Sequence, residues 1–542
     1  MPGPRPVASG ALPAVEDSAA APAVEVERPA NTAFGDFATN LAMKLARPLR
    51  RAPLDIAEAL ASSLRAGEDA ALFASVNVAR PGFLNLRVAD AAYEQLVAGV
   101  LAAPAMWGRI PAVNPRKVNV EFVSANPTGP LTVGNARGAF VGDLLCRVLE
   151  AGGQEVTREY YFNDSGAQIN HLGASVWALR RGEPVPEDGY KGAYVETLAR
   201  EVPDDVWGAA SVDGAEPDVV LGAWASKRVR GMIEASLARL GVHFDVWKSE
   251  ASLHDEGWVA RAVERLRAAG EVYEQDGATW FRSTAYGDDK DRVIYKSDGR
   301  PTYFAADIGY VTEKFSRGFD HLIYIWGVDH HGTIARNKNA AQAMGYDPEH
   351  YSVLLIGWVR FVADGVEVSM SKRAGTFVTL DDLLDAVGVD AARWFFASRA
   401  AHVAFDFDIE QAKKQSAENP VYYVQYAHAR IASILRRAEA AGLAPTASIE
   451  GLLEGEPESA LARVLSRLPE VVEDAVLAEE TQGVTAYATE LATQFHAFYR
   501  DARVLDEAEP ERSARRLALA LATKTTLANA LGLLGISAPE SM

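Results

Sequence analysis

The stretch "ANPTGPLTVGNARGA", residues 125–139, joins turn-forming residues to the start of a predicted helix. Pro127 and Gly129 predict a turn, and Gly134 followed by Asn135 marks the entry to the helix. Backbone N–H groups at a helix N-terminus attract phosphate, and a glycine lets a flat base approach the backbone. The stretch has neither Gly-x-Gly-x-x-Gly nor Lys-Ser/Thr. Taken by itself, the stretch is therefore best interpreted as a tight structural turn.

A second stretch, "DGVEVSMSKRAGTFVTLDDLL" at residues 364–384, adds positive charge at a second loop. Lys372 and Arg373 lie in a Ser- and Gly-bearing segment between an apolar run and a new helical pattern. A cationic loop meets the charge that builds up on a leaving polyphosphate. Together the two stretches favour nucleotide chemistry that releases a polyphosphate.

The overall charge is acidic. The 542 residues include 54 Lys or Arg and 73 Asp or Glu, a net charge of −19. Taken alone, this total argues against a nucleic-acid partner, although a local basic face can still bind nucleic acid.

No stretch reaches the roughly 18 apolar residues of a membrane span, and the N-terminus lacks the apolar core of a signal peptide. We expect a cytoplasmic protein with no membrane association, in which the single Cys146 is a buried core residue.

The first 110 residues have the pattern of a small α+β unit. Apolar residues recur at helical spacing over 34–64, and residues 76–88 alternate as in a strand. The proline-rich stretch 102–117 predicts a linker into the next domain.

Residues 111–405 are predicted to form a Rossmann-type domain with a parallel sheet. Strand-like runs alternate with helical stretches, as in doubly wound folds. The middle, about 185–300, is rich in charge and loops and is expected to be inserted between the halves of the fold. The strand-like runs are 118–123, 321–327 and 351–359, and the helical stretches are 136–151 and 332–345.

Residues 406–542 are predicted to form an all-α bundle. The predicted fold is thus multidomain α/β, with a small N-terminal α+β domain, a Rossmann-type domain with insertions and a C-terminal helical bundle. Basic residues cluster on the bundle helices, among them Arg430 and Arg436, and a solvated helix face would explain them equally well. Helices are expected at about 419–442, 458–476, 478–503 and 510–535.

The two loop stretches resemble the signature pair of class I aminoacyl-tRNA synthetases, His-x-Gly-His and Lys-Met-Ser-Lys-Ser/Arg. Here Thr132 and Asn135 replace both histidines, and the first lysine of the second motif is absent. Thr and Asn can donate hydrogen bonds to a phosphate but carry no charge. The resemblance implies catalytic roles for Thr132, Asn135 and Lys372, and ATP binding by Pro127, Gly129, Thr132, Gly134, Asn135, Met370, Ser371, Lys372 and Arg373.

Further segments, spread over nearly the whole chain, resemble the bacterial arginyl-tRNA synthetase family. Among them are "FGDFATNLAMKLA", "YYFNDSGAQI", "PTYFAADIGY", "IYIWGVDHHG", "ENPVYYVQYAHARI" and "LLGISAPESM". The resemblance implies an N-terminal domain at 1–110 that binds the tRNA elbow, a catalytic domain at 111–405 and an anticodon-binding domain at 406–542.

A site for arginine should be acidic, because the guanidinium is a planar fork of donors that pairs with carboxylates. Tyr303 and Asp307 lie four apart and would share one face of a helix. For any one of these residues a structural ion pair or a surface acid is the alternative. The resemblance places Asp307, Tyr303 and Glu250 at the guanidinium, with Asn126, Glu121 and His330 near the amino end.

A metal site at His330 and His331 is not expected. Neighbouring residues on a strand point to opposite faces, so two adjacent histidines do not converge on one ion.

The segment "RPGFLNLRV" implies, through the same resemblance, that Phe83 and Asn85 contact an unstacked base of tRNA. The alternative is a core phenylalanine and a turn asparagine. Arg430 and Arg436 are the tRNA-binding candidates of the C-terminal helices.

The resemblance implies a complete reaction. ATP, with Mg²⁺, and L-arginine would give arginyl-adenylate and pyrophosphate, and the arginyl group would pass to the 3′-terminal adenosine of tRNA(Arg). The enzyme would be a monomer with no permanently bound cofactor, and it would need bound tRNA for activation. Two alternatives remain: a catalytically impaired tRNA-binding paralogue, and a nucleotidylyltransferase of the same fold, against which the long helical C-terminus argues.

Overall fold

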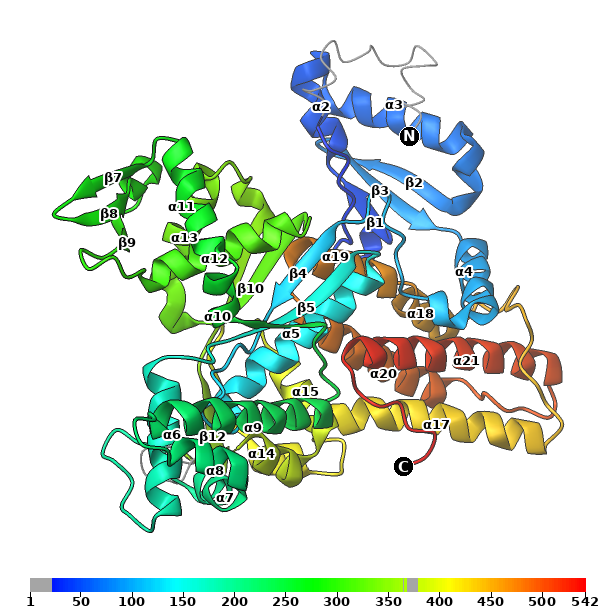
Figure 1. Ribbon diagram of the computed structural model, residues 1–542. Helices are drawn as coiled ribbons and strands as arrows, with labels where there is room; N and C mark the ends of the chain where they lie inside the picture. Colours follow the sequence, from blue (N-terminus) through cyan, green and yellow to red (C-terminus); the bar gives the residue numbers. More distant parts are fainter. Residues whose placement is uncertain (1–21, 364, 368–378) are drawn as a thin grey trace. The chain divides into compact units, whose positions relative to one another are not determined.

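The computed structural model describes residues 22–363, 365–367 and 379–542, and the chain divides into two compact units (Figure 1). The larger unit consists of Gly108–Ala429, Leu468–Ala492 and Leu527–Met542. The smaller unit joins the N-terminal part to Arg430–Arg467 and Thr493–Thr526.

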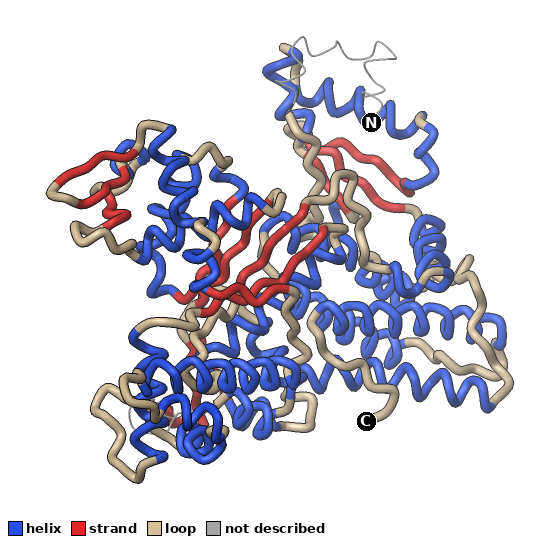
Figure 2. The backbone as a smooth tube through the Cα atoms, in the orientation of Figure 1, coloured by secondary structure: helices blue, strands red, loops and turns tan. Residues whose placement is uncertain are grey.

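A five-stranded parallel sheet is the centre of the larger unit (Figure 2). Its strand order is β11-β10-β4-β5-β6, and every neighbouring pair is parallel. The predicted Rossmann-type parallel sheet is confirmed. The strands are β4 (Lys117–Glu121), β5 (Glu155–Phe162), β6 (Val246–Ser249), β10 (His321–Gly327) and β11 (Tyr351–Ile356).

Helices cover both faces of this sheet, and the central strand β10 is largely apolar on both sides. On β10, Leu322 and Tyr324 pack with α12 (Tyr303–Ser316) and α13 (His331–Ala343), while the alternate residues face the other side. Helix α5 (Val133–Ala151) packs so closely that a Cβ on Gly142 would lie 2.3 Å from the Phe122 ring. This contact fixes α5 against the centre of the sheet. The helix starts at Val133, three residues earlier than predicted.

The middle of the larger unit is more regular than its sequence indicated. Four helices form a layer of their own, in which α6 (Ala167–Arg180) and α9 (Pro217–Arg239) pack against each other. Strand β6 lies within 185–300 but belongs to the central sheet. It has only four residues, all of them partly exposed, so no apolar run announced it. The other two helices of the layer are α7 (Ala193–Glu201) and α8 (Asp204–Ala210).

Smaller elements complete the larger unit. They are α10 (Glu250–Asp255), α11 (Trp258–Ala268), β7 (Val272–Gln275), β8 (Ala278–Phe281), β9 (Arg292–Tyr295), β12 (Val359–Ala363), β13 (Val366–Glu367), α14 (Leu380–Val387), α15 (Val389–Ala397), β14 (Phe405–Asp408), α16 (Ile409–Lys413) and α19 (Leu468–Ala478).

The smaller unit combines the N-terminal sheet with C-terminal helices. An antiparallel sheet, β1-β3-β2, packs on two helices, as the α+β pattern predicted. Asp36 lies 3.3 Å from Arg463, and Glu94 accepts a 2.7 Å hydrogen bond from the backbone of Gly451. Its elements are β1 (Phe37–Thr39), α2 (Leu41–Leu49), α3 (Pro53–Ala66), β2 (Phe73–Ala79), β3 (Phe83–Val88), α4 (Asp90–Ala102) and α18 (Glu456–Leu465).

Three long helices contribute residues to both units, and they confirm the predicted helical C-terminal region. They are α17 (Pro420–Ala440), α20 (Gln482–Asp501) and α21 (Pro510–Leu533). Within the described ranges, no helix is long and apolar enough to cross a membrane.

Candidate active site

The loop after β4 ends in a helix start that Thr132 and Asn135 hold together. The Asn135 side-chain oxygen accepts hydrogen bonds from the backbone N–H and the hydroxyl of Thr132, each at 3.0 Å. The backbone N–H of Asn135 donates in turn to the Thr132 carbonyl at 2.9 Å. The two residues that replace the signature histidines thus form the N-terminal cap of α5. A phosphate at this helix end would meet fixed N–H groups rather than imidazole charge.

Gly134 has no packing reason to be glycine. A Cβ there would meet only the Thr132 hydroxyl, at 3.4 Å, within the described structure. Its φ lies outside the left-handed region, so the backbone does not require glycine either. Open space above a helix N-terminus is what an approaching nucleotide needs.

The residues that follow the second motif lie beside this helix start. Met370, Ser371, Lys372 and Arg373 lie outside the described residues. The residue that follows the segment, Thr379, forms an isolated bridge with Thr132, and the N–H of Leu380 donates to the Leu131 carbonyl at 2.9 Å. Thr379 also caps α14 together with Asp382. The fold therefore anchors the residues that follow the cationic segment at the start of α5.

A cavity of about 330 Å³ opens next to the cap. Gly134 and Asn135 line it together with His330, whose side chain is 58% exposed. His330 lies in a short 3₁₀ turn, and His331 starts α13. The expectation that the two histidines are neighbours on a strand was therefore wrong. The cavity also includes Gly327, Gly357 and Trp358. Its glycine-rich wall suits a flat base.

Arg137 fixes one wall of this cavity. Its guanidinium is fully buried and donates to the carbonyls of Gly357 (2.9 Å), Val403 (2.7 Å) and Ala400 (2.8 Å). Burial lowers its pKa to about 10, so it stays charged at neutral pH. It ties α5 to Gly357, directly after β11, and to the loop between α15 and β14.

Three carboxylates act electrostatically on Tyr161 of β5. Burial raises the pKa of the Tyr161 hydroxyl, and Glu250, Asp307 and Glu121 raise it further, with a hydrogen bond to Glu250 among the causes. The pKa of Asp307 is raised to about 6, first by burial and then by Glu121 and Glu250, against the lowering effect of Arg336. Such a cluster fits a cationic guest.

The resident cations near this cluster leave part of its charge uncompensated. Arg336 lies 4.0 Å from Asp307, at the limit of an ion pair. Lys314 is fully buried and lies 2.6 Å from Glu121, which also accepts a hydrogen bond from Ser124. Glu121 is thus engaged with Lys314, while Asp307 keeps 37% of its side-chain exposure.

Helix α12 carries much of this chemistry on one face. Asp307, Tyr310, Lys314 and Arg317 are spaced by three and four residues. Tyr303, the first residue of the helix, is 82% exposed. Sequence reasoning missed Tyr161, Lys314 and Arg317, although the spacing on α12 could have pointed to the last two.

Asn126 is held by α6 and by the residue that follows β5. Its amide donates to Gln168 at 2.9 Å, and its carbonyl oxygen accepts from the backbone of Asn163 at 3.2 Å. Contact with the amino end of a substrate stays a prediction for Asn126 and Glu121.

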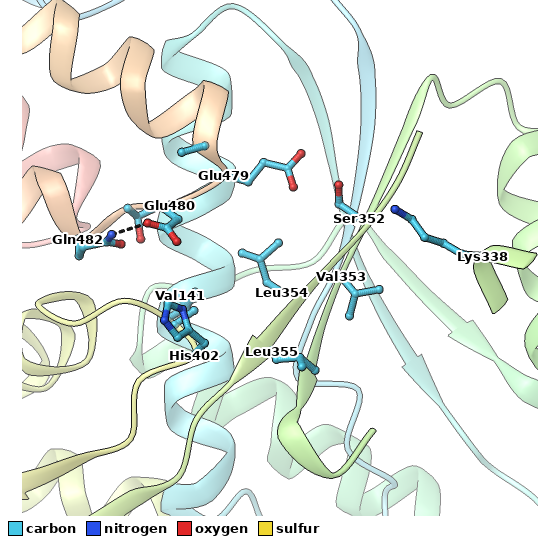
Figure 3. A pocket seen from close by; sticks show the side chains of 13 residues that line it. Val141, Lys338, Ser352, Val353, Leu354, Leu355, His402, Glu479, Glu480 and Gln482 are labelled. Carbon is cyan, nitrogen blue, oxygen red and sulfur yellow. Dashed lines mark hydrogen bonds between the residues drawn. The ribbon is translucent and has the colours of Figure 1, made fainter. Parts of the chain in front are cut away.

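A Ser–His–Glu cluster at the edge strand β11 resembles a nucleophilic triad but is not one. Figure 3 shows Ser352 and Glu479 at a cavity of about 470 Å³ that Lys338 also lines. His321 contacts Glu479 at 2.7 Å and Ser352 at 3.2 Å through the same atom, Nε2. A triad needs both ring nitrogens. The cluster therefore joins β10, β11 and the residue after α19.

The predicted tRNA-binding residues lie in the smaller unit. On β3, Leu84 and Leu86 face the core, and Phe83 and Asn85 share the opposite, half-exposed face. Phe83 is thus not the core residue of the alternative interpretation. Arg430 lies over the Tyr499 ring at 4.4 Å. Contact of these residues and of Arg436 with tRNA stays a prediction.

Models of three protein families match successive parts of the chain. The arginyl tRNA synthetase N terminal domain matches residues 8–88, and the class I (R) tRNA synthetase catalytic domain matches 97–183 and 212–433. The DALR anticodon binding domain matches 424–542.

Relatives match over nearly the whole length. An arginine–tRNA ligase of Bacillus licheniformis is 45% identical, covering 96% of this chain and 95% of the relative. One from Citrifermentans bemidjiense has the same identity and coverage. The structure of Thermus thermophilus arginyl-tRNA synthetase shares the fold, with a TM-score of 0.76 and 23% identity over 99% of this chain and 98% of that one. The chain belongs to the arginyl-tRNA synthetase family of class I aminoacyl-tRNA synthetases.

Proposed function

We propose that the protein activates L-arginine with ATP and transfers it to the 3′-terminal adenosine of tRNA(Arg). The observation that carries this proposal is the cluster of Glu121, Glu250 and Asp307 around Tyr161, a site for a cation in a fold of this family. The substrate's own carboxylate attacks the α-phosphate, so no side chain acts as nucleophile. Catalysis then rests on positioning and electrostatics.

Each part of the site has a role in this proposal. The N-terminus of α5, with Thr132, Gly134 and Asn135, receives the adenosine and the α-phosphate, and Asp307 with Tyr303 receives the guanidinium. Mg²⁺ arrives with ATP. Residues 1–110 would bind the tRNA elbow and 406–542 the anticodon, and the enzyme would act as a cytoplasmic monomer.

The direct test is aminoacylation with each of the twenty amino acids, with and without tRNA(Arg). Of the twenty amino acids, only arginine should be attached to the tRNA. Charging of another amino acid, or tRNA binding with no ATP–pyrophosphate exchange when arginine and tRNA(Arg) are present, would contradict the proposal.

Arginine use should depend on pH through Asp307. Its pKa of about 6 means that the carboxylate is charged above pH 6 and neutral below it, so only the higher pH range offers the guanidinium an anion. We expect kcat/KM for arginine to fall up to about tenfold per unit below pH 6. Steady-state kinetics between pH 5 and 8 measure it. In Asp307→Asn this step should disappear, and an unchanged profile in the variant would assign it to another group.

Lys372→Ala should slow arginine activation more than it weakens tRNA binding. A charged hydrogen bond to a departing phosphate is worth about 1.5–3 kcal/mol, or roughly 10- to 100-fold in rate. ATP–pyrophosphate exchange and tRNA affinity are compared on the same protein. Equal losses in both would make Lys372 a tRNA contact instead.

A further inference from the structure

The loop between β4 and α5 is braced from the helical layer by Tyr194. This residue is the second of α7, and its hydroxyl donates a 2.8 Å hydrogen bond to the carbonyl of Thr128. From α6, Gln168 holds Asn126 at 2.9 Å. Two helices of the layer thus hold the same turn of the loop.

The contact is close enough to restrict the residue next to Thr128. A Cβ on Gly129 would lie 3.2 Å from the Tyr194 hydroxyl oxygen and 3.4 Å from the ring carbon that bears it. The φ of Gly129 is outside the left-handed region, so its backbone would accept alanine. What limits a side chain at this position is the phenol packed against it.

The Tyr194 hydroxyl is suited to act as a permanent donor. Burial raises its pKa, and nearby Tyr190 raises it further, so the phenol stays protonated at any physiological pH. The N–H of Thr128 already donates to the Asn126 carbonyl at 2.8 Å. The N–H of Thr128 is thus bonded within the turn, while the carbonyl of Thr128 accepts its hydrogen bond from Tyr194.

The same residues form one wall of a large cavity. Thr128, Gly129 and Tyr194 line a space of about 880 Å³ that Asn135, on the first turn of α5, also lines. The turn therefore sets the shape of the space in front of the helix N-terminus, where a phosphate would bind.

We propose that Tyr194 is a positioning residue for ATP, acting through the Thr128 carbonyl. The proposal rests on the proposed function, which places ATP at this loop. Without the hydroxyl, the turn is no longer held in the conformation that leaves room for the phosphates, so ATP use should suffer. The part of the arginine site that would hold the guanidinium, around Tyr161 on β5 and Asp307 on α12, should stay unchanged.

Tyr194→Phe tests this by removing one oxygen atom. We expect kcat/KM for ATP in tRNA-supported arginine activation to fall about tenfold, with the arginine KM within about twofold of wild type and an unchanged Tm. Tyr273→Phe is the matched control, because it removes a hydroxyl that donates to Asp291 at 2.9 Å on the distant β7–β9 sheet. Wild-type ATP kinetics in Tyr194→Phe, or an equal loss toward arginine, would overturn the proposal.

A double-mutant cycle with Gly129→Ala makes the test independent of folding losses. In the wild-type background the new methyl group presses on the phenol, while in the Tyr194→Phe background it meets no hydroxyl. The two changes should therefore cost less together than the product of their separate fold-losses, and multiplicative losses would refute the link. ATP affinity by calorimetry is measured on all four proteins. A wild-type protein that binds ATP but does not activate arginine would refute the proposed function. The ATP affinities of the four proteins would still test the role of Tyr194.

Discussion

Asp307→Ala raises the KM for arginine by at least about 30-fold and leaves ATP affinity nearly unchanged; this is the largest change in activity that we expect from one side chain. Truncating one partner of a hydrogen-bonded charge pair in a binding site costs about 2–5 kcal/mol, and the lower value corresponds to about 30-fold. Asp307 is the best placed of the three carboxylates, because Glu121 is engaged with Lys314 and Arg336 approaches Asp307 only to 4.0 Å.

Two further variants distinguish charge from shape at Asp307. Asp307→Asn keeps the volume of the side chain and removes its charge, so it should lose nearly as much arginine affinity as alanine does. Asp298→Ala is the control, since it removes a carboxylate of the same unit that pairs with Arg300 at the surface. Steady-state kinetics with varied arginine measure all three. An unaltered arginine KM in Asp307→Ala would remove this residue from the pocket.

The parts of the site that are local in sequence could be predicted from it. The turn, the helix entry at Gly134 and Asn135 and the helix that follows lie within residues 127–151, and their pattern carries its own structural meaning. The cap formed by Thr132 was not predicted, and the helix starts three residues earlier than expected. The run that became β10 was predicted for a similar reason, because a strand buried on both faces is continuously apolar. The run that became β11 is also apolar, although only Tyr351 in it is buried.

The partners across the fold could not be predicted in this way. Lys314 meets Glu121 although 193 positions separate them, and a lysine on a predicted helix is ordinarily assigned to solvent. Tyr194 lies in a stretch that resembled surface loops, and only the tertiary structure brings it to Thr128. Strand β6 is four residues long at the edge of the sheet, too short and too exposed to show a period.

Lys314→Met should lower the free energy of unfolding by about 3–5 kcal/mol, the largest change in stability that we expect. Removing one member of a buried ion pair leaves the other charge without compensation in a medium of low polarity. The Lys314 ammonium is fully buried, 2.6 Å from Glu121, and lies over the rings of Tyr310 (4.3 Å) and Tyr324 (4.0 Å). Methionine can occupy much of the same volume, so the loss reports charge rather than a cavity.

Adding Glu121→Gln to Lys314→Met tests this explanation. With both charges gone, no unpaired ion is buried, and we expect much of the lost stability to return. Arg181→Ala is the surface control, because its pair with Glu183 is about half exposed on both sides and should contribute about 1 kcal/mol or less. Urea unfolding followed by fluorescence and by hydrogen exchange of β4 measures the series. If the double variant is no more stable than Lys314→Met, the cost comes from packing around the lysine and not from the charge left on Glu121.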